Sequence, residues 1–192
     1  MHLRYEDIGV TIETWPRSEE EFEALYLALF EGVYRLLVRI TGSPAEAEDL
    51  VQETFLRCYR QRPGKGKPSV RPWLFRVAMN LGYNARRDRR RREARHAEAA
   101  RESIGARADD PIESIAREEE RRRVRQALDR LPPRQSQTLL LRHAGLSYRE
   151  VAEALELSPG SVGTLLSRAE AAFEKAYRKP AAIPETEDRR DV

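Results

Sequence analysis

Residues suited to a chemical task gather on one predicted helix and in the arginine run that follows it. Arg76 and Asn80 are four positions apart, so on a helix their side chains project from one face, one turn apart. An asparagine amide can form a bidentate contact with a base edge, and an arginine can bind a base or a phosphate. The pair therefore predicts contact with nucleic acid.

The arginine run begins six residues after Asn80. Residues 86–95 hold seven arginines against two acids, although the formal net charge of the whole chain is only +3. Such side chains would neutralise phosphate charge without reading sequence, and their contribution should fall steeply with salt. A solvated helix face is the alternative, and charge alone does not decide between the two. The residues taken as candidates for phosphate contact are Arg86, Arg87 and Arg90.

Residue types for catalysis or metal binding are sparse. His2, His96 and His143 are far apart in the sequence, and the single cysteine, Cys58, falls on an apolar stripe. No nucleophile–base pair and no multi-ligand metal site follows from this set, and one cysteine cannot form an internal disulfide. We therefore predict no catalytic residue, no metal and no cofactor.

The elements that would position these residues are helices. Apolar side chains recur at three- and four-residue steps over 22–40, which predicts one amphipathic helix that stops at Gly42. Ser43 is predicted to cap the next helix, with Pro44 in its first turn and Glu46 completing a capping box. That second helix runs to about residue 61. Its predicted buried residues are Ala47, Leu50, Val51, Phe55, Cys58 and Tyr59.

A loop rich in Pro, Gly and Lys follows, and Pro72 then opens a third helix that continues into the arginine run. Trp73 on this helix has two interpretations. It could stack on an unpaired base, or it could pack in the core, as its spacing with Val77 favours.

The chain is predicted to be all-α, with two small helical domains joined by a flexible linker. The first domain spans 15–92, and the linker covers 93–110, where large apolar residues are few. The second domain covers 111–179 and contains a helix-turn-helix, and the polar tail 180–192 is predicted to be disordered. No run approaches the roughly 20 apolar residues that span a bilayer, and the first residues lack a signal-peptide layout. This predicts a cytoplasmic protein without membrane contact.

The helix-turn-helix lies within residues 147–178. Ser147 and Ser158 are each predicted to cap a helix, and Glu150 is predicted to complete a capping box with Ser147. Ala152 leaves room where two steeply crossed helices approach, and Leu157 fills the space under the turn. The second helix of such a motif enters the DNA major groove, whereas an ordinary helical hairpin is the alternative.

The side chains expected to face DNA in this motif are Arg149, Ser158, Ser161, Thr164, Ser167 and Arg168. Most of them are small and neutral. A helix of this kind can approach DNA closely and bind phosphates through hydroxyl and backbone groups, but it offers few bidentate readers of bases. We therefore predict weaker or more shape-dependent reading of DNA sequence by this helix.

Three segments together resemble one family, the extracytoplasmic-function (ECF) sigma factors of bacterial RNA polymerase. Residues 47–55 (AEDLVQETF) resemble the domain-two helix that grips the polymerase clamp, and residues 71–80 (RPWLFRVAMN) resemble the helix that melts and reads the upstream promoter element. Residues 131–152 resemble domain four. The matches occur in the family's order and cover roughly residues 20–178.

The resemblance implies a set of partners and roles. Asp49, Gln52 and Glu53 would contact the β′ clamp of core RNA polymerase, and the second domain would contact its β flap. Arg76, Asn80 and Trp73 would melt and read promoter DNA. Free members are monomers that are commonly held inactive by an anti-sigma factor wedged between the two domains, which the linker permits.

The sequence departs from the family pattern in two places. Family members usually carry basic residues where this chain has Gly163 and Leu165, and another near Glu170. The loop 62–70 lacks the aromatic residue that members often place there. Two other function classes stay open: a helix-turn-helix regulator that binds an operator without polymerase, and an enzyme. The regulator leaves the resemblance of 47–55 and 71–80 unexplained.

Overall fold

The computed structural model describes residues 14–61, 69–99 and 112–178, and within these ranges every regular element is a helix. The predicted all-α class is therefore confirmed. The tail, the larger part of the linker and all but the last two residues of the loop 62–70 lie outside the described residues. The helices are α1 (Glu19–Thr41), α2 (Pro44–Arg60), α3 (Val70–Ala99), α4 (Ile112–Asp129), α5 (Pro133–His143), α6 (Tyr148–Leu155) and α7 (Pro159–Arg178).

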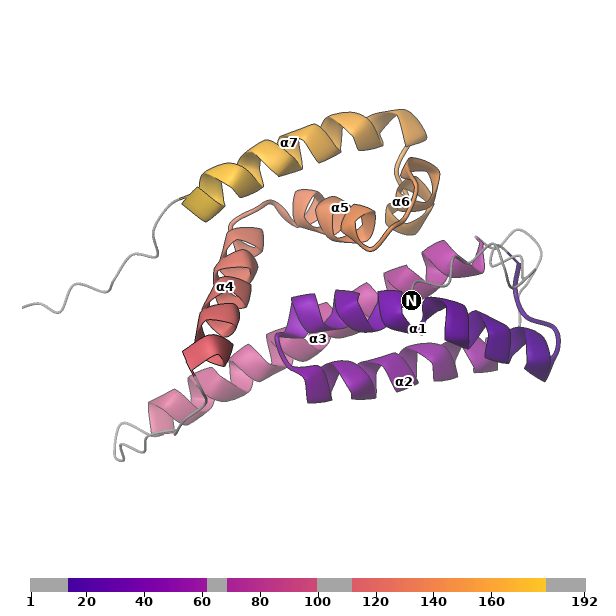
Figure 1. The fold of residues 1–192 in the computed structure, drawn as a ribbon, viewed down its shortest axis with the longest axis horizontal. Coiled ribbons are helices and arrows are strands. Elements are labelled where there is room, and N and C mark those ends of the chain that lie inside the picture. Colours follow the sequence, from indigo (N-terminus) through magenta and orange to yellow (C-terminus); the bar gives the residue numbers. More distant parts are fainter. Residues whose placement is uncertain (1–13, 62–68, 100–111, 179–192) are drawn as a thin grey trace, which may run out of the picture.

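Helices α1, α2 and α3 form the first bundle, in which each contacts the other two (Figure 1). The predicted boundary between α1 and α2 is confirmed. Gly42 has a φ of 75° and donates its N–H to the Val38 carbonyl, so the helix ends where glycine tolerates the left-handed conformation. Ser43 then caps α2 by accepting from the backbone N–H of Glu46 at 3.3 Å.

Two details predicted for α2 are wrong. The Glu46 carboxylate does not complete a capping box, because the Ser43 N–H donates to Thr41 Oγ1 and Glu46 accepts from Arg89 instead. Tyr59 is 58% exposed rather than buried, since it lies near the end of the helix and packs only edgewise on Phe22. The partner that Glu46 takes instead, Arg89, is 43 positions away in the sequence.

Helix α3 is 30 residues long, so the predicted linker is helical up to Ala99. Arg89 ties the later part of this helix to the rest of the bundle. Its Nη1 donates to Glu46 Oε2 at 2.6 Å and its Nη2 donates to the carbonyl of Thr41. The arginine run therefore extends from the bundle as a continuation of α3, with no break at the domain boundary.

Helix α3 packs tightly against α1 at Gly82. A Cβ atom there would lie 3.0 Å from Ile40 Cγ2 and 3.1 Å from Leu37 Cδ2. We expect Gly82→Val to lower the free energy of unfolding by about 2 kcal/mol, since overpacking forces the two helices apart. Urea titration followed by circular dichroism measures the change. In the control, Gly163→Ala, the new Cβ meets only Tyr148 Cε2 at 3.6 Å, and the stability should rise by about 0.5–1 kcal/mol. A Gly82→Val variant as stable as the parent would contradict the packing argument.

Helices α4 to α7 form the second bundle, with α7 contacting α4, α5 and α6. The capping box predicted at Ser147 and Glu150 is confirmed in both directions. Ala152 and Val162 are buried where α6 and α7 meet, as a helix-turn-helix requires. The turn between them is made by Glu156, whose φ of 55° places a non-glycine residue in the left-handed region.

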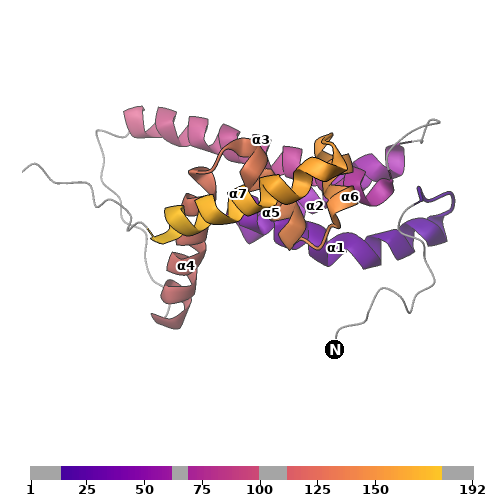
Figure 2. The same ribbon diagram turned by 90° about the horizontal axis from the view of Figure 1, so that it is seen from above.

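The two bundles pack on each other, and α6 lies against the first half of α3 (Figure 2). Their buried apolar residues form one continuous cluster, from Leu25 in α1 to Val162 in α7. Helix α7 lies on the side of the second bundle away from α1 and α2 (Figure 1). The contact between the bundles therefore covers part of α3 and leaves α7 open.

Candidate nucleic-acid interface

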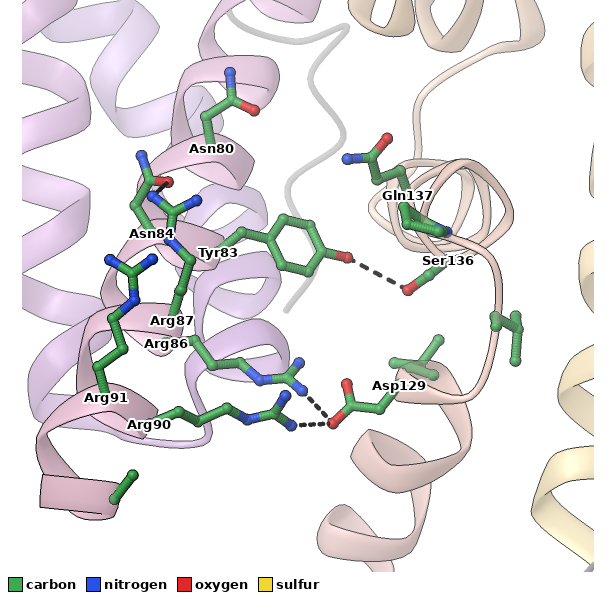
Figure 3. A pocket seen from close by; sticks show the side chains of 14 residues that line it. Asn80, Tyr83, Asn84, Arg86, Arg87, Arg90, Arg91, Asp129, Ser136 and Gln137 are labelled. Atoms are coloured by element: carbon green, nitrogen blue, oxygen red, sulfur yellow. Dashed lines mark hydrogen bonds and ion pairs between the residues drawn. The ribbon is translucent and has the colours of Figure 1, made fainter.

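Asn80 projects from the middle of α3 into open space between the bundles. Its side chain is exposed and makes no hydrogen bond within the described part of the chain. It lines a cavity of about 760 Å³ between α3 and the α4–α5 corner, together with Asn84 and Gln137 (Figure 3). An amide free to turn at an open edge is able to bind a base.

Arg76 lies one turn before Asn80, as the sequence predicts, but it already has a partner. Its guanidinium forms an ion pair with Glu156, the residue at the turn of the helix-turn-helix. The Arg76 side chain is 27% exposed and that of Glu156 is 77% exposed. Arg76 and Asn80 thus occupy the same helix face, and only Asn80 is unengaged.

The arginine run divides into two groups. Arg86 and Arg90 both pair with Asp129 at the end of α4 (Figure 3). Arg87 is exposed, lines the same cavity, and within the described ranges donates only to Asn84, at 3.1 Å. A phosphate that binds an arginine must replace any partner that the arginine already has. Of the three candidates, Arg87 therefore loses the least when it binds a phosphate.

Substitutions of Arg87 and Arg89 should therefore have different effects, because one arginine is assigned to phosphate contact and the other to the structure of the bundle. We expect Arg87→Ala to reduce the slope of log affinity against log salt by about 0.9 for duplex DNA, with unchanged stability. Arg89→Ala should instead lower the free energy of unfolding by about 1 kcal/mol, because it removes the contacts to Glu46 and Thr41. Fluorescence anisotropy at several salt concentrations and urea titration measure the two effects. Equal salt slopes for the parent and Arg87→Ala would contradict the assignment.

Of the two interpretations of Trp73, the structure supports packing in the core. It is 9% exposed, and its ring lies 4.9 Å from that of Trp15, centroid to centroid. Its neighbours Leu74 and Phe75 are buried as well. Stacking on a base would require Trp73 to leave this contact.

The outer face of α2 carries the residues expected to contact a polymerase. Asp49 and Gln52 are exposed and have no partner within the described residues, whereas Glu53 pairs with Arg57 at 2.7 Å. Two apolar side chains continue the same face: Leu56 is 39% exposed and Tyr59 is 58% exposed. The sequence interpretation missed this apolar extension, although the steps from 49 to 52, 56 and 59 are those of one helix face.

The outward side of the helix-turn-helix is confirmed as solvent-facing. Ser158, Thr164, Ser167 and Arg168 are exposed, and so is Arg149 on α6; Ser161 is partly exposed. Two hydroxyls on this surface are used within the motif. Ser161 donates to the carbonyl of Ser158 at 2.7 Å, and Ser167 donates to that of Gly163 at 3.2 Å. They can accept a further hydrogen bond, but they are not free to donate one, which fits few base contacts.

The surroundings of Glu150, at the contact between the bundles, favour its ionised form. Burial opposes its ionisation, but hydrogen bonds from the Ser147 backbone, the Ser147 hydroxyl and Arg71 outweigh burial and hold the pKa of Glu150 below its ordinary value. In the first bundle, burial raises the pKa of the Cys58 thiol to about 12. Cys58 is therefore an unreactive core residue.

The described residues offer neither a metal site nor a membrane-spanning helix. No group of three or more His, Cys, Asp or Glu side chains in these ranges could hold a metal ion. No helix in the same ranges is long and apolar enough to cross a membrane. The polar and charged face of α3, the outer face of α2 and the outer face of α7 are the candidate surfaces.

Comparison with known proteins assigns both halves of the chain. Residues 25–92 match the family model of Sigma-70 region 2, and residues 121–173 match that of Sigma-70 region 4. The RNA polymerase sigma-H factor of Pseudomonas aeruginosa is 32% identical over 84% of this chain and 88% of its own length. The ECF RNA polymerase sigma factor SigG of Mycobacterium tuberculosis is 34% identical over 80% of this chain. This chain spans about half the length of SigG, 49%.

Solved structures give the same fold. A structure of CnrH in complex with the cytosolic domain of CnrY has a TM-score of 0.57 at 22% identity, covering 83% of this chain and 88% of that one. The sigma factor RpoE in complex with the anti-sigma factor NepR from Bartonella quintana has a TM-score of 0.56 at 21% identity, covering 84% and 99%. At these identities the likeness extends to the fold alone.

Proposed function

The chain belongs to the ECF family of RNA polymerase sigma factors, and from that membership we propose that it binds core RNA polymerase and directs it to promoters. One observation carries the proposal: a single chain matches region 2 over its first bundle and region 4 over its second. An operator-binding regulator would need only the helix-turn-helix, so the region 2 match favours the sigma factor.

Binding to core polymerase is assigned to the outer face of α2 on the first bundle. Asp49 and Gln52 have no partner there among the described residues, and Glu53 lies beside them. The exposed Leu56 and Tyr59 add apolar area to the same face. A polar start and an apolar continuation on one helix suit a helical partner such as the β′ clamp. The second bundle is assigned to the β flap.

Promoter reading is divided between α3 and α7. Asn80 and Arg76 read and melt the upstream element in the proposal, while Arg86, Arg87 and Arg90 bind its phosphates. Arg149, Ser158, Ser161, Thr164, Ser167 and Arg168 contact the second element. Because α7 offers few base readers, sequence discrimination rests more on the first bundle.

The remaining partners follow from the same proposal. Sigma factors are non-catalytic initiation factors, so the polymerase performs the chemistry, in the cytoplasm, and this chain requires no cofactor. An anti-sigma factor is a further partner, as NepR is for RpoE in the similar solved structure. The free protein is a monomer whose two domains flank the linker 93–110.

In vitro transcription tests the proposal. The purified chain is mixed with core polymerase and a promoter library, and transcripts are sequenced. Promoter-dependent initiation above that of core alone is expected, together with co-elution of the chain with core. Failure to bind core, or a footprint on DNA by the chain alone with no transcripts, would favour the operator-binding regulator instead.

A further inference from the structure

A groove of about 440 Å³ lies between the second half of α1 and α4, beside the start of α2. Its apolar lining comes from all three helices, and each of these side chains keeps part of its surface exposed: Tyr34, Val38, Pro44 and Val124. A ligand that covers such a surface gains the free energy of removing it from water. The groove is therefore able to bind an apolar side chain.

Arginines form the polar part of the groove, and Arg39 is the one among them without an acid. Its Nη2 lies 2.8 Å from His143 Nε2, and the described part of the chain gives it no carboxylate partner. Burial, together with the charge of Arg35, holds the pKa of Arg39 below its ordinary value. A half-buried guanidinium beside a second one favours an anion. The groove thus suits a ligand that has an apolar group followed by a carboxylate.

The last turn of α7 lies beside α4 (Figure 1, Figure 2). The Tyr177 hydroxyl donates to Glu120 Oε1, and the guanidinium carbon of Arg123 lies 4.8 Å from the centroid of the Tyr177 ring. Glu120 also lines the groove. The chain therefore reaches Arg178, the last described residue of α7, next to this groove.

The tail, residues 180–192, begins two positions after Arg178 and has one large apolar residue near its start. That residue is Ile183, and Pro180 and Pro184 stand on either side of it. Five residues separate Arg178 from Ile183, which allows a reach of at most about 17 Å at roughly 3.3 Å per residue. The fixed φ of the two prolines lowers the conformational entropy that docking would cost. Ile183 is thus suited to the apolar lining in reach and in type.

Acidic residues follow Ile183 directly in the tail. They are Glu185, Glu187 and Asp188. A carboxylate is the group that a guanidinium binds with paired hydrogen bonds, and Arg39 is available for one. A short tether holds the tail at an effective concentration on the order of 1 mM, so a weak contact is enough to keep it bound.

We propose that the tail binds in the groove between α1 and α4 as an intramolecular ligand. Ile183 packs against Val38 and Val124, and a carboxylate from the acidic stretch 185–188 binds Arg39. The tail then covers an apolar surface that the helices alone leave exposed. The proposal makes no use of polymerase or promoter DNA, so it does not depend on the proposed function.

Paramagnetic relaxation in the full chain tests this placement. A nitroxide is attached at Thr186→Cys in the nitrogen-15 labelled protein. Cys58 stays unlabelled, since a buried thiol with a pKa of about 12 offers almost no thiolate. The amide signals of Val38 and Val124 should lose intensity and regain it when the nitroxide is reduced. The amide signal of Gln52, on the outer face of α2, should keep its intensity.

Substitutions in the tail test the anchor without altering a helix. Burial of one isoleucine side chain corresponds to roughly a 10- to 150-fold change in an equilibrium constant. Ile183→Ser should lower the docking equilibrium by a factor in this range, so that most of the intensity at Val38 and Val124 returns. The control, Val192→Ser, removes an apolar side chain outside the proposed contact and should leave the loss of intensity unchanged.

Two neighbouring arginines on α4 provide a matched pair for the groove. The side chains of Arg121 and Arg122 are both 62% exposed, but Arg121 lines the groove and Arg122 does not. Arg121→Glu should lower the docking equilibrium about two- to fivefold, because it places an acid near the acidic stretch of the tail. Arg122→Glu should have no effect. Circular dichroism establishes that both variants keep the helical content of the parent.

Three results would overturn the proposal. In the first, the nitroxide affects only amides at the end of α7, and in the second, Ile183→Ser and the parent lose equal intensity at Val38 and Val124. The third comes from a mixture of nitrogen-15 labelled chain without nitroxide and unlabelled chain with it. Loss of intensity in that mixture would mean that the groove binds the tail of a second copy.

Discussion

Asn80→Ala is expected to reduce open-complex formation by about 10- to 100-fold, the cost of one bidentate base contact. Asn80 is exposed and has no hydrogen bond within the described residues, so its removal should leave the fold intact. The reduction in open-complex formation would then come from weaker binding of the unpaired base. Arg76→Ala should reduce open-complex formation less, since it also removes the ion pair with Glu156 that joins the two bundles.

Permanganate reactivity of unpaired thymines in the polymerase–promoter complex measures this effect. Gln126→Ala provides the control, because it removes another exposed amide, on α4. Both variants should bind core polymerase as tightly as the parent does. If Asn80→Ala weakened double-stranded binding while melting stayed unchanged, the assignment of α3 to promoter melting would be wrong.

The double variant Asp49→Ala, Gln52→Ala is expected to weaken binding to core polymerase by about 30-fold or more, as truncation of interface hot spots does. Both side chains are exposed on α2 and have no partner within the described residues. Their loss should therefore leave the free energy of unfolding unchanged. Transcription should be restored at high concentrations of the variant, since only the affinity has changed.

A matched control removes the same chemical groups elsewhere. Glu23→Ala with Gln126→Ala takes away one carboxylate and one amide, both exposed and outside α2. Biolayer interferometry with immobilised core polymerase compares the three proteins. Equal affinity of the two double variants would exclude the α2 face as a specific contact. A further loss on Leu56→Ala would extend the face to its apolar end.

Features set by neighbouring residues were predictable from the sequence. The end of α1 at Gly42, the cap at Ser43 and the capping box at Ser147 each depend on side chains within four positions. The all-α class followed from apolar spacing in the same way, because that spacing reports the buried face of each helix. The roles of Asn80 and the α2 face stay predictions, since they depend on partners outside the chain.

Features set by distant partners were not predictable from periodicity. Glu46 was assigned to a local capping box, yet its partner Arg89 is 43 positions away. The sequence assigns Arg76 to nucleic acid, yet Glu156, 80 positions away, binds it. Hydrophobic spacing says which face of a helix is buried, but not which charged groups meet when two bundles pack. The contacts between the two bundles could therefore be seen only in three dimensions.

Because α3 is one continuous helix, the distance between Asn80 and Arg90 along it is fixed. Asn80 and Arg90 are on one helix, and at about 1.5 Å of rise per residue they are separated by about 15 Å along its axis. That span corresponds to roughly four base pairs of duplex at 3.4 Å each. No hinge lies between the two, and Arg89 clamps the helix to α1 and α2 near its far end. The helix thus holds the two contacts at a constant spacing. A promoter with one base pair inserted between the base read by Asn80 and the phosphates near Arg90 would have to distort, because the helix cannot lengthen.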